Sequence, residues 1–167
     1  MALVQRQDST VEAENVRDSW LNVGGFRVIT YMNKANLFEF WLDPDNPLTL
    51  ELEGLGKLQP DRHYERTDGG SIPRPLWWVP GLEPTRFLRS FIFHDSGYFH
   101  GGLWLDGAFV SMTRAEVDTV LYRGTRAEGG NKFVTGLIYN VVRGCGWVAW
   151  NHRTKHRAAE AKKRPRK

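Results

Sequence analysis

The sequence Phe91-Ile-Phe-His-Asp-Ser-Gly-Tyr98 embeds polar residues in an aromatic and aliphatic stretch. Its apolar residues recur with helical spacing from about residue 86 to 99, and Gly101 and Gly102 then suit the end of a helix. On that helix His94 and Tyr98 lie four residues apart and share one face. Burying a histidine and an aspartate costs free energy unless both find hydrogen-bond partners. We therefore expect a polar partner elsewhere in the chain.

Asp118 is the predicted partner. A second helix is expected to begin at Thr113, because Thr113 and Glu116 have the spacing of a capping box, and to stop near the glycines at 129 and 130. If the two helices form an antiparallel hairpin, the Asp118 carboxylate can accept a hydrogen bond from His94 or from the Tyr98 hydroxyl. A histidine oriented by a carboxylate is a common general base acting on water. The alternative is a polar lock that fixes the helix pair without any chemistry.

Asp95 is, in the catalytic interpretation, free to hold a hard cation such as calcium, assisted by backbone carbonyls of a glycine loop. That loop lies in Thr67-Asp-Gly-Gly-Ser-Ile-Pro-Arg-Pro-Leu-Trp-Trp78. Its glycines permit positive φ or a close approach of backbone N–H groups to a ligand, and its prolines stiffen the backbone after them. The candidate ligand-positioning residues are Asp68, Gly69, Gly70, Ser71 and Arg74. The alternative is a tight crossover under a packed core.

The remaining pattern predicts an α+β fold. Strands are expected at residues 26–31, 37–42 and 48–53, so that residues from about 20 to 66 form a small antiparallel sheet. A third helix is expected from residue 132 to about 144. The sheet thus precedes a three-helix unit, in which a helical hairpin carries His94 and Asp118. We expect a single domain over residues 20–150, a polar arm over 1–19 and a basic tail over 151–167.

Charge is distributed unevenly along the chain. Residues 151–167 hold eight Lys or Arg and one Glu, a net charge of +7. The other 150 residues hold 15 Lys or Arg and 18 Asp or Glu, a net charge of −3. A basic segment of this kind suits nucleic acid, an anionic membrane surface or an acidic partner. The alternative is a solvated, disordered end.

Composition indicates an ordinary globular protein, with 41% hydrophobic and 25% charged residues. We expect no transmembrane segment, because the apolar stretches are short, and no secretory signal, because the first 19 residues lack an apolar core. The single cysteine, Cys145, excludes an internal disulfide, fits a reducing cytoplasm and is interpreted as a small buried thiol. Trp77 and Trp78 belong either to the core or to the rim of an interface or ligand pocket. The sequence is compatible with both a monomer and a homo-oligomer.

Other common kinds of site lack sequence support. The five histidines show no metal-ligand spacing, and there is no CxxC pair. Neither a GxGxxG nor a GxxxxGK[ST] motif is present, which argues against a nucleotide site. Ser71 does not lie in a G-x-S-x-G elbow, so it is a poor candidate for a serine nucleophile.

Several of these motifs together resemble a family of unknown function whose members are small phage-encoded and prophage-derived bacterial proteins. The motifs are Thr67-Asp68, Ser71-Ile-Pro-Arg74, Trp77, His94-Asp95-x-x-Tyr98 and Arg114-Ala-Glu-x-Asp118, and the similarity covers about residues 20–150. The chain departs from the pattern at Gly69 and Gly70, where bulkier residues are common, and at Val117, where alanine is common. The resemblance implies a phage origin, and it implies no particular activity.

The H-D-x-x-Y motif also resembles that of secretory and viral-capsid phospholipases, which place it opposite an aspartate on an antiparallel helix. This resemblance implies that His94 is the base for a lipid-attacking water, Asp95 a calcium ligand, and Tyr98 and Asp118 the supporting network. The chain departs from the pattern in its loop, because about 24 residues separate Gly70 from His94. It also lacks the paired cysteines of the secretory enzymes.

The motifs support two functional hypotheses. In the first, which the residue types favour by a narrow margin, the chain is a virion-associated or tail-assembly protein, present in the host cytoplasm during assembly or in the virion. There His94, Asp95, Tyr98 and Asp118 form a buried polar network, and the basic tail and tryptophans contact other phage structural proteins or the genome. In the alternative, the chain is a calcium-assisted hydrolase of lipid or envelope esters with His94 as general base.

Overall fold

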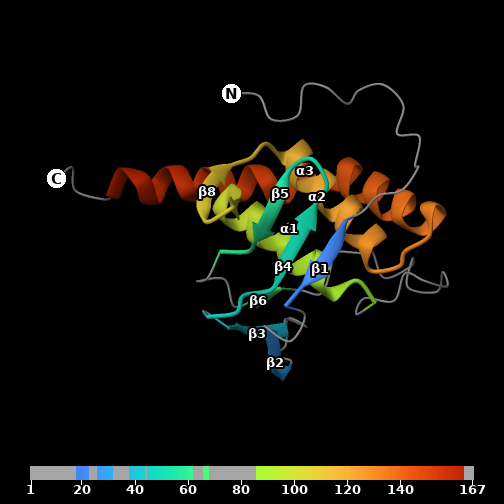
Figure 1. The fold of residues 1–167 in the computed structure, drawn as a ribbon. Helices are drawn as coiled ribbons and strands as arrows, with labels where there is room; N and C mark the ends of the chain where they lie inside the picture. The colour runs from blue at the N-terminus through green and yellow to red at the C-terminus, as the bar shows by residue number, and fades with distance from the viewer. Residues whose placement is uncertain are drawn as a thin grey trace.

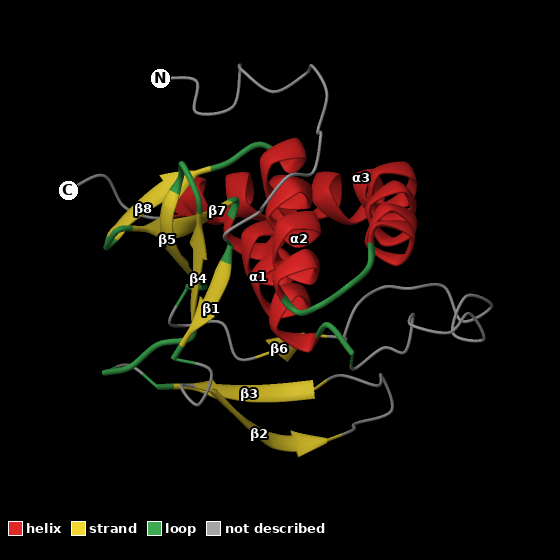
Figure 2. Ribbon diagram, turned by 45° about the vertical axis from the view of Figure 1, so that its right-hand side comes forward, coloured by secondary structure: helices red, strands yellow, loops and turns green. Residues whose placement is uncertain are grey.

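A computed structural model describes residues 18–22, 26–31, 38–43, 45–61, 66–67 and 86–163 of the chain. Within these residues antiparallel strands are combined with three helices, which confirms the expected α+β class. The helices lie to one side of the larger sheet (Figure 2). No helix of the described part combines the length and apolar character needed to cross a membrane.

The larger sheet has five antiparallel strands in the order β1-β4-β5-β7-β8. These are β1 (Ser19–Leu21), β4 (Thr49–Leu52), β5 (Gly56–Gln59), β7 (Gly102–Leu105) and β8 (Ala108–Ser111). Leu50 of β4 pairs with Leu58 of β5, and both side chains are fully buried. The apolar residues of the alternating pattern around residues 48–53 thus lie on the inner face of a strand, and its glutamates lie on the outer face.

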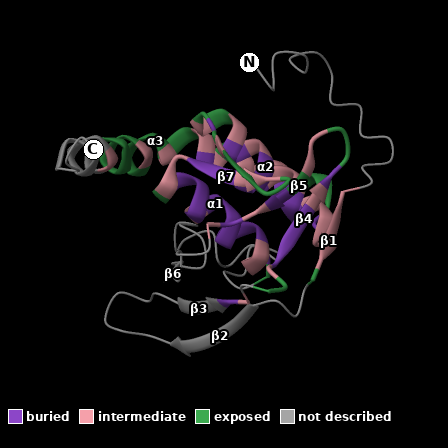
Figure 3. Ribbon diagram, turned by 60° about the vertical axis from the view of Figure 1, so that its left-hand side comes forward, coloured by how far each residue is buried: buried purple, intermediate pink, exposed green. Residues whose placement is uncertain are grey.

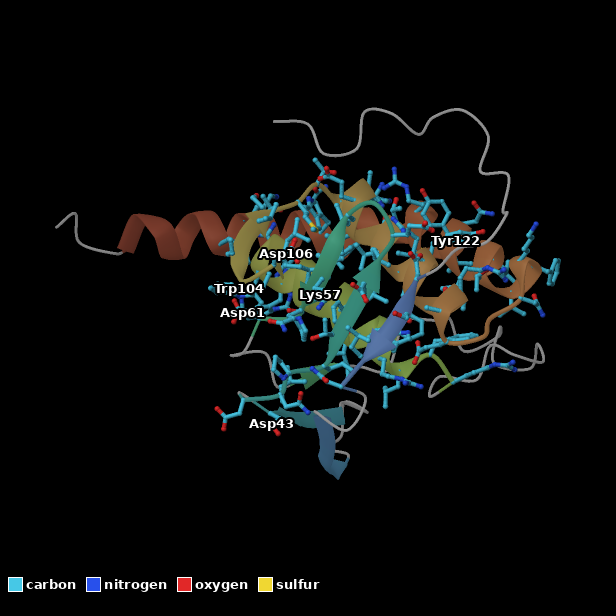
Figure 4. All side chains as sticks on the ribbon, viewed as in Figure 1. Asp43, Lys57, Asp61, Trp104, Asp106 and Tyr122 are labelled. Atoms are coloured by element: carbon cyan, nitrogen blue, oxygen red, sulfur yellow. The ribbon has the colours of Figure 1, made fainter. Side chains whose placement is uncertain are left out.

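The hairpin of β7 and β8 was not predicted, and it adds two strands to a sheet that we expected to end near residue 66. Gly102, interpreted as part of a helix stop, is the first residue of β7. The turn between the strands has positive φ at Asp106 (47°) and Gly107 (83°), as an Asp-Gly hairpin turn requires. Asp106 Oδ1 accepts a hydrogen bond from the backbone N–H of Lys57 at 3.0 Å and so fixes the turn to β5 (Figure 4).

A second sheet of three antiparallel strands has the order β2-β3-β6. It consists of β2 (Phe26–Tyr31), β3 (Phe38–Leu42) and β6 (Arg66–Thr67). The strands predicted at 26–31 and 37–42 therefore form as expected. They do not join the strand near 48–53 in one sheet, because that strand pairs with β1 and β5 instead.

The helices are α1 (Leu88–His100), α2 (Arg114–Ala127) and α3 (Lys132–Lys163). Gly101 ends α1 in the left-handed region with φ 78°, as a glycine after a helix commonly does. Thr113 and Glu116 form the predicted capping box at the start of α2. The first two helices therefore begin and end close to where we expected.

The predicted end of α3 near residue 144 is wrong, because the helix continues for 19 further residues to Lys163. The stretch 151–163, expected as part of a separate tail, is helical. Gly144 and Gly146 do not stop the helix, and the Ala, Lys and Arg residues that come after them favour helix. Cys145 is exposed on this helix, which corrects the expectation of a buried thiol.

Two apolar clusters form the core, and α1 contributes to both. Ile92 and Phe93 of α1 pack against the leucines of β4 and β5. Phe91 of α1 packs against α2 and α3 in the second cluster, with Leu121 and Ile138. Figure 3 shows this central helix as mostly buried, whereas residues 147–155 of α3 are largely exposed. A polar residue on the inner faces of α1 is thus surrounded by other elements.

Candidate functional site

The residues selected from the sequence meet between α1 and α2. His94 Nε2 lies 3.2 Å from Asp118 Oδ1, and the Tyr98 hydroxyl donates a hydrogen bond to the same oxygen at 2.7 Å. The rings of His94 and Tyr98, one helical turn apart, have centroids separated by 4.1 Å. The structure therefore brings His94, Tyr98 and Asp118 together as we predicted.

Close packing of the two helices makes this geometry possible. A Cβ atom added to Gly97 would lie 2.7 Å from Val117 Cγ1, so α1 has no room for a larger residue at this position. Gly97 and Val117 immediately precede Tyr98 and Asp118 in the chain. The capping box at Thr113 sets where α2 begins, and it thereby sets the position of Asp118 one turn later.

Two arginines complete the surroundings of Asp118. Arg143 of α3 donates to Asp118 Oδ2 at 2.9 Å, and Arg114 Nη1 lies 3.8 Å from the same oxygen. Arg114 also donates to the backbone carbonyl of Arg143 at 3.0 Å. The Arg114–Asp118 spacing of four residues was visible in the sequence, whereas no local pattern indicated Arg143. One carboxylate thus connects all three helices.

Charge is stabilised within this network. Burial by itself would lower the pKa of His94, but its contacts with Asp118 and Asp95 outweigh burial and raise that pKa above the ordinary value. Burial would raise the pKa of Asp118, yet hydrogen bonds from His94, Arg143 and Tyr98 hold it below its usual value. Burial, followed by the hydrogen bond to Asp118, raises the pKa of Tyr98, so its hydroxyl remains a donor. Asp118 is therefore ionised at neutral pH.

The two nitrogens of His94 face different environments. The Asp118 side chain beside Nε2 has no exposed surface, whereas 19% of the Asp95 side chain near Nδ1 is exposed. His94 Nδ1 lies 3.4 Å from Asp95 Oδ1. A neutral imidazole that donates from Nε2 carries its lone pair on Nδ1. Deprotonation therefore leaves an acceptor on the more open side of the ring.

α3 packs against Tyr98 through Trp150 and Gly146. Trp150 meets the Tyr98 ring edge to face, with centroids 5.1 Å apart. A Cβ atom on Gly146 would lie 2.5 Å from the Tyr98 hydroxyl oxygen. The extension of α3 beyond residue 144 therefore contributes to the site, and its predicted early end concealed this contribution.

The calcium site expected at Asp95 stays a prediction, because the glycine loop that was to supply its backbone carbonyls lies outside the described residues. Asp95 is the carboxylate expected to ligate the ion, and calcium takes six to eight oxygen ligands. Within the described ranges no group of three His, Cys, Asp or Glu side chains could hold a metal ion. The predicted loop residues lie outside those ranges; they are Asp68, Gly69, Gly70, Ser71 and Arg74.

Comparison of the chain with protein-family models, with curated proteins and with solved structures gives no match.

Proposed function

We propose that the protein is a hydrolase of lipid or cell-envelope esters in which His94 acts as general base. The observation that supports this proposal is the orientation of one histidine. Its Nε2 is bound to a fully buried, ionised carboxylate, and its Nδ1 faces the partly exposed Asp95. The Asp118 contact favours the tautomer that donates from Nε2, and the lone pair on Nδ1 then lies on the Asp95 side of the ring, where a general base would take a proton from water.

In the proposed reaction, neutral His94 takes a proton from water on Nδ1 while the water oxygen bonds to the ester carbonyl carbon. Asp118 stabilises the imidazolium that forms, because its carboxylate lies 3.2 Å from Nε2. Collapse of the tetrahedral intermediate breaks the carbon–oxygen bond to the alcohol, and the alkoxide takes the proton from His94. The products are a carboxylic acid and an alcohol, and His94 returns to its neutral form.

Tyr98, Arg143 and Arg114 are positioning residues in this proposal. Tyr98 shares Asp118 Oδ1 with the histidine, and Arg143 binds Oδ2, so the carboxylate plane is fixed at both oxygens. Arg114 donates a hydrogen bond to the backbone carbonyl of Arg143 and so holds Arg143 in position for its contact with Asp118. A carboxylate constrained at both oxygens holds the imidazole in a single orientation.

The experiment compares wild type, His94→Gln and His152→Gln for hydrolysis of p-nitrophenyl butyrate and of phosphatidylglycerol vesicles. Each assay is run with calcium and with chelator. His152 is an exposed histidine of α3 and provides the matched control. We expect at least a 100-fold lower rate for His94→Gln, within the range that general bases contribute, and an unchanged rate for His152→Gln. Equal rates in all three proteins on both substrates would refute the proposal.

A second candidate function is a virion-associated or tail-assembly role without catalysis in a phage-encoded protein. The specific observation in its favour is that Asp118 is bound by partners from all three helices, two of them arginines. A buried carboxylate whose two oxygens both have hydrogen-bond partners can also hold the three helices together without any catalytic role. In that case His94→Gln would lower the stability of the fold, and wild type would hydrolyse neither substrate faster than the variant.

A further inference from the structure

The distal part of α3 is anchored to the end of α1. Arg157 donates from Nη1 to the backbone carbonyls of Tyr98, at 2.5 Å, and Phe99, at 3.1 Å. The Arg153 guanidinium lies 4.7 Å from the centroid of the Phe99 ring. Cations near the carboxyl end of a helix are favoured by its exposed carbonyls and dipole. Contacts with α1 therefore fix one side of α3 as far as Arg157. The helix continues to Lys163 and extends past the other helices and the sheet (Figure 1).

The opposite side of this segment is exposed. Trp147, Asn151 and Lys155 succeed one another at intervals of four residues, so they share a face, and all three are exposed. Of these, Trp147 has 55% of its surface accessible, and its neighbour Val148 has 56%. The exposed surface therefore begins with an apolar pair, Trp147 and Val148, and is polar at Asn151 and basic at Lys155.

Positive charge is concentrated along the same segment. Residues 151–163 contain five Lys or Arg and one Glu, and the full stretch 151–167 has a net charge of +7 against −3 for the other 150 residues. The 13 helical residues span about 20 Å, comparable to roughly six base pairs of duplex DNA. A polyanion is attracted to this arm and repelled by the mildly acidic remainder of the chain.

We propose that the helical arm 151–163 binds the phosphate backbone of duplex DNA without sequence preference. The proposal is independent of the hydrolase proposal, because it uses none of the residues around His94. An anionic membrane surface is the less favoured partner. A helix that lies in a membrane interface needs a continuous apolar face, and here the exposed face turns polar at Asn151, while Trp150 already packs on Tyr98.

The test measures binding of the full chain to a fluorescent 30-base-pair duplex by anisotropy. The arm variant is Arg153→Glu/Lys155→Glu, and the control is Lys57→Glu/Lys132→Glu, which changes net charge equally at exposed lysines outside the arm. We expect at least tenfold weaker binding for the arm variant and less than threefold for the control. The dependence of log K on log salt should become shallower by roughly 2 for the arm variant. Circular dichroism checks that helix content is retained.

Two further measurements separate DNA from a membrane. Trp147→Ala is expected to leave DNA affinity within twofold of wild type, because the contacts are electrostatic. Vesicles containing 30% phosphatidylglycerol are expected to bind wild type more weakly than the duplex does at the same salt concentration. The proposal is overturned if arm and control variants bind DNA equally. It is also overturned if wild type binds the vesicles but not the duplex, or if Trp147→Ala removes DNA binding.

Discussion

The backbone of α3 at Gly146 lies directly against the hydroxyl of Tyr98, with 2.5 Å between that oxygen and the position a Cβ atom would take. A third helix thus closes over a residue that hydrogen-bonds to Asp118. Because real Cβ atoms do not approach so closely, the absence of a side chain at residue 146 is a condition for this packing. The site is therefore a property of three helices, although the sequence motifs that indicate it lie on two.

Gly146→Ala is expected to destabilise the protein, whereas Gly144→Ala is expected to stabilise it. At Gly144 nothing lies within 4 Å of an added Cβ, so the gain in helix propensity of about 0.5–1 kcal/mol remains. At Gly146 the clash with Tyr98 costs about 1–3 kcal/mol, which exceeds that gain. Urea denaturation of both variants gives the two changes. Stabilisation by Gly146→Ala equal to that of Gly144→Ala would show that α3 does not press on Tyr98.

Tyr98→Phe is expected to lower the free energy of unfolding by about 1.5–3 kcal/mol, because it removes a hydrogen bond to a buried, ionised carboxylate. The ring contacts with His94 and Trp150 remain available to phenylalanine. Tyr122→Phe is a matched control (Tyr122 is labelled in Figure 4), because its ring packs edge to face on Tyr139 and this contact survives the change. Chemical denaturation at pH 7 measures both. Equal effects of the two substitutions would argue against the Tyr98–Asp118 bond.

The stabilising contribution of His94 is expected to depend on pH. Its pKa is raised in the folded protein, so the contribution is complete below pH 6.5, the ordinary value, and is lost as pH rises through the raised pKa. Asp95 and Asp118 face the ring, and Arg143 and Arg114 face Asp118 from the other side. The difference in unfolding free energy between wild type and His94→Gln, measured with chelator from pH 5.5 to 9, should therefore shrink at high pH. A difference that grows with pH would mean that burial dominates and the pKa is lowered.

Local sequence chemistry predicted α1 and α2 and the central residues of the site. The capping box at Thr113, the glycine after α1 and the four-residue spacing of His94 and Tyr98 each act within one or two turns of helix. Such signals can be read without knowing the rest of the fold. The α+β class could be predicted from the change of period between the first and second halves of the chain.

Long-range contacts could not be predicted in the same way. Arg143 reaches Asp118 across 25 residues, and only the packing of α3 on α2 brings them together. The third helix was expected to end near Gly144, yet Gly144 is tolerated on an exposed face, and Gly146 is required by its contact with Tyr98. The β7–β8 hairpin was missed for a different reason, since its Asp106-Gly107 turn was present in the sequence and the adjacent glycines were assigned to a helix stop.

The most direct test of His94 as a general base is the dependence of kcat/KM on pH for hydrolysis of p-nitrophenyl butyrate, in wild type and His94→Gln. Because only the neutral imidazole accepts a proton, the wild-type rate should rise about tenfold per pH unit at low pH and level off above a midpoint higher than 6.5. The His94→Gln rate should be at least 100-fold lower at the plateau and show no such titration. A wild-type profile that coincides with that of His94→Gln, in rate and in shape, would contradict a catalytic role for the pair and leave Asp118 as a structural lock.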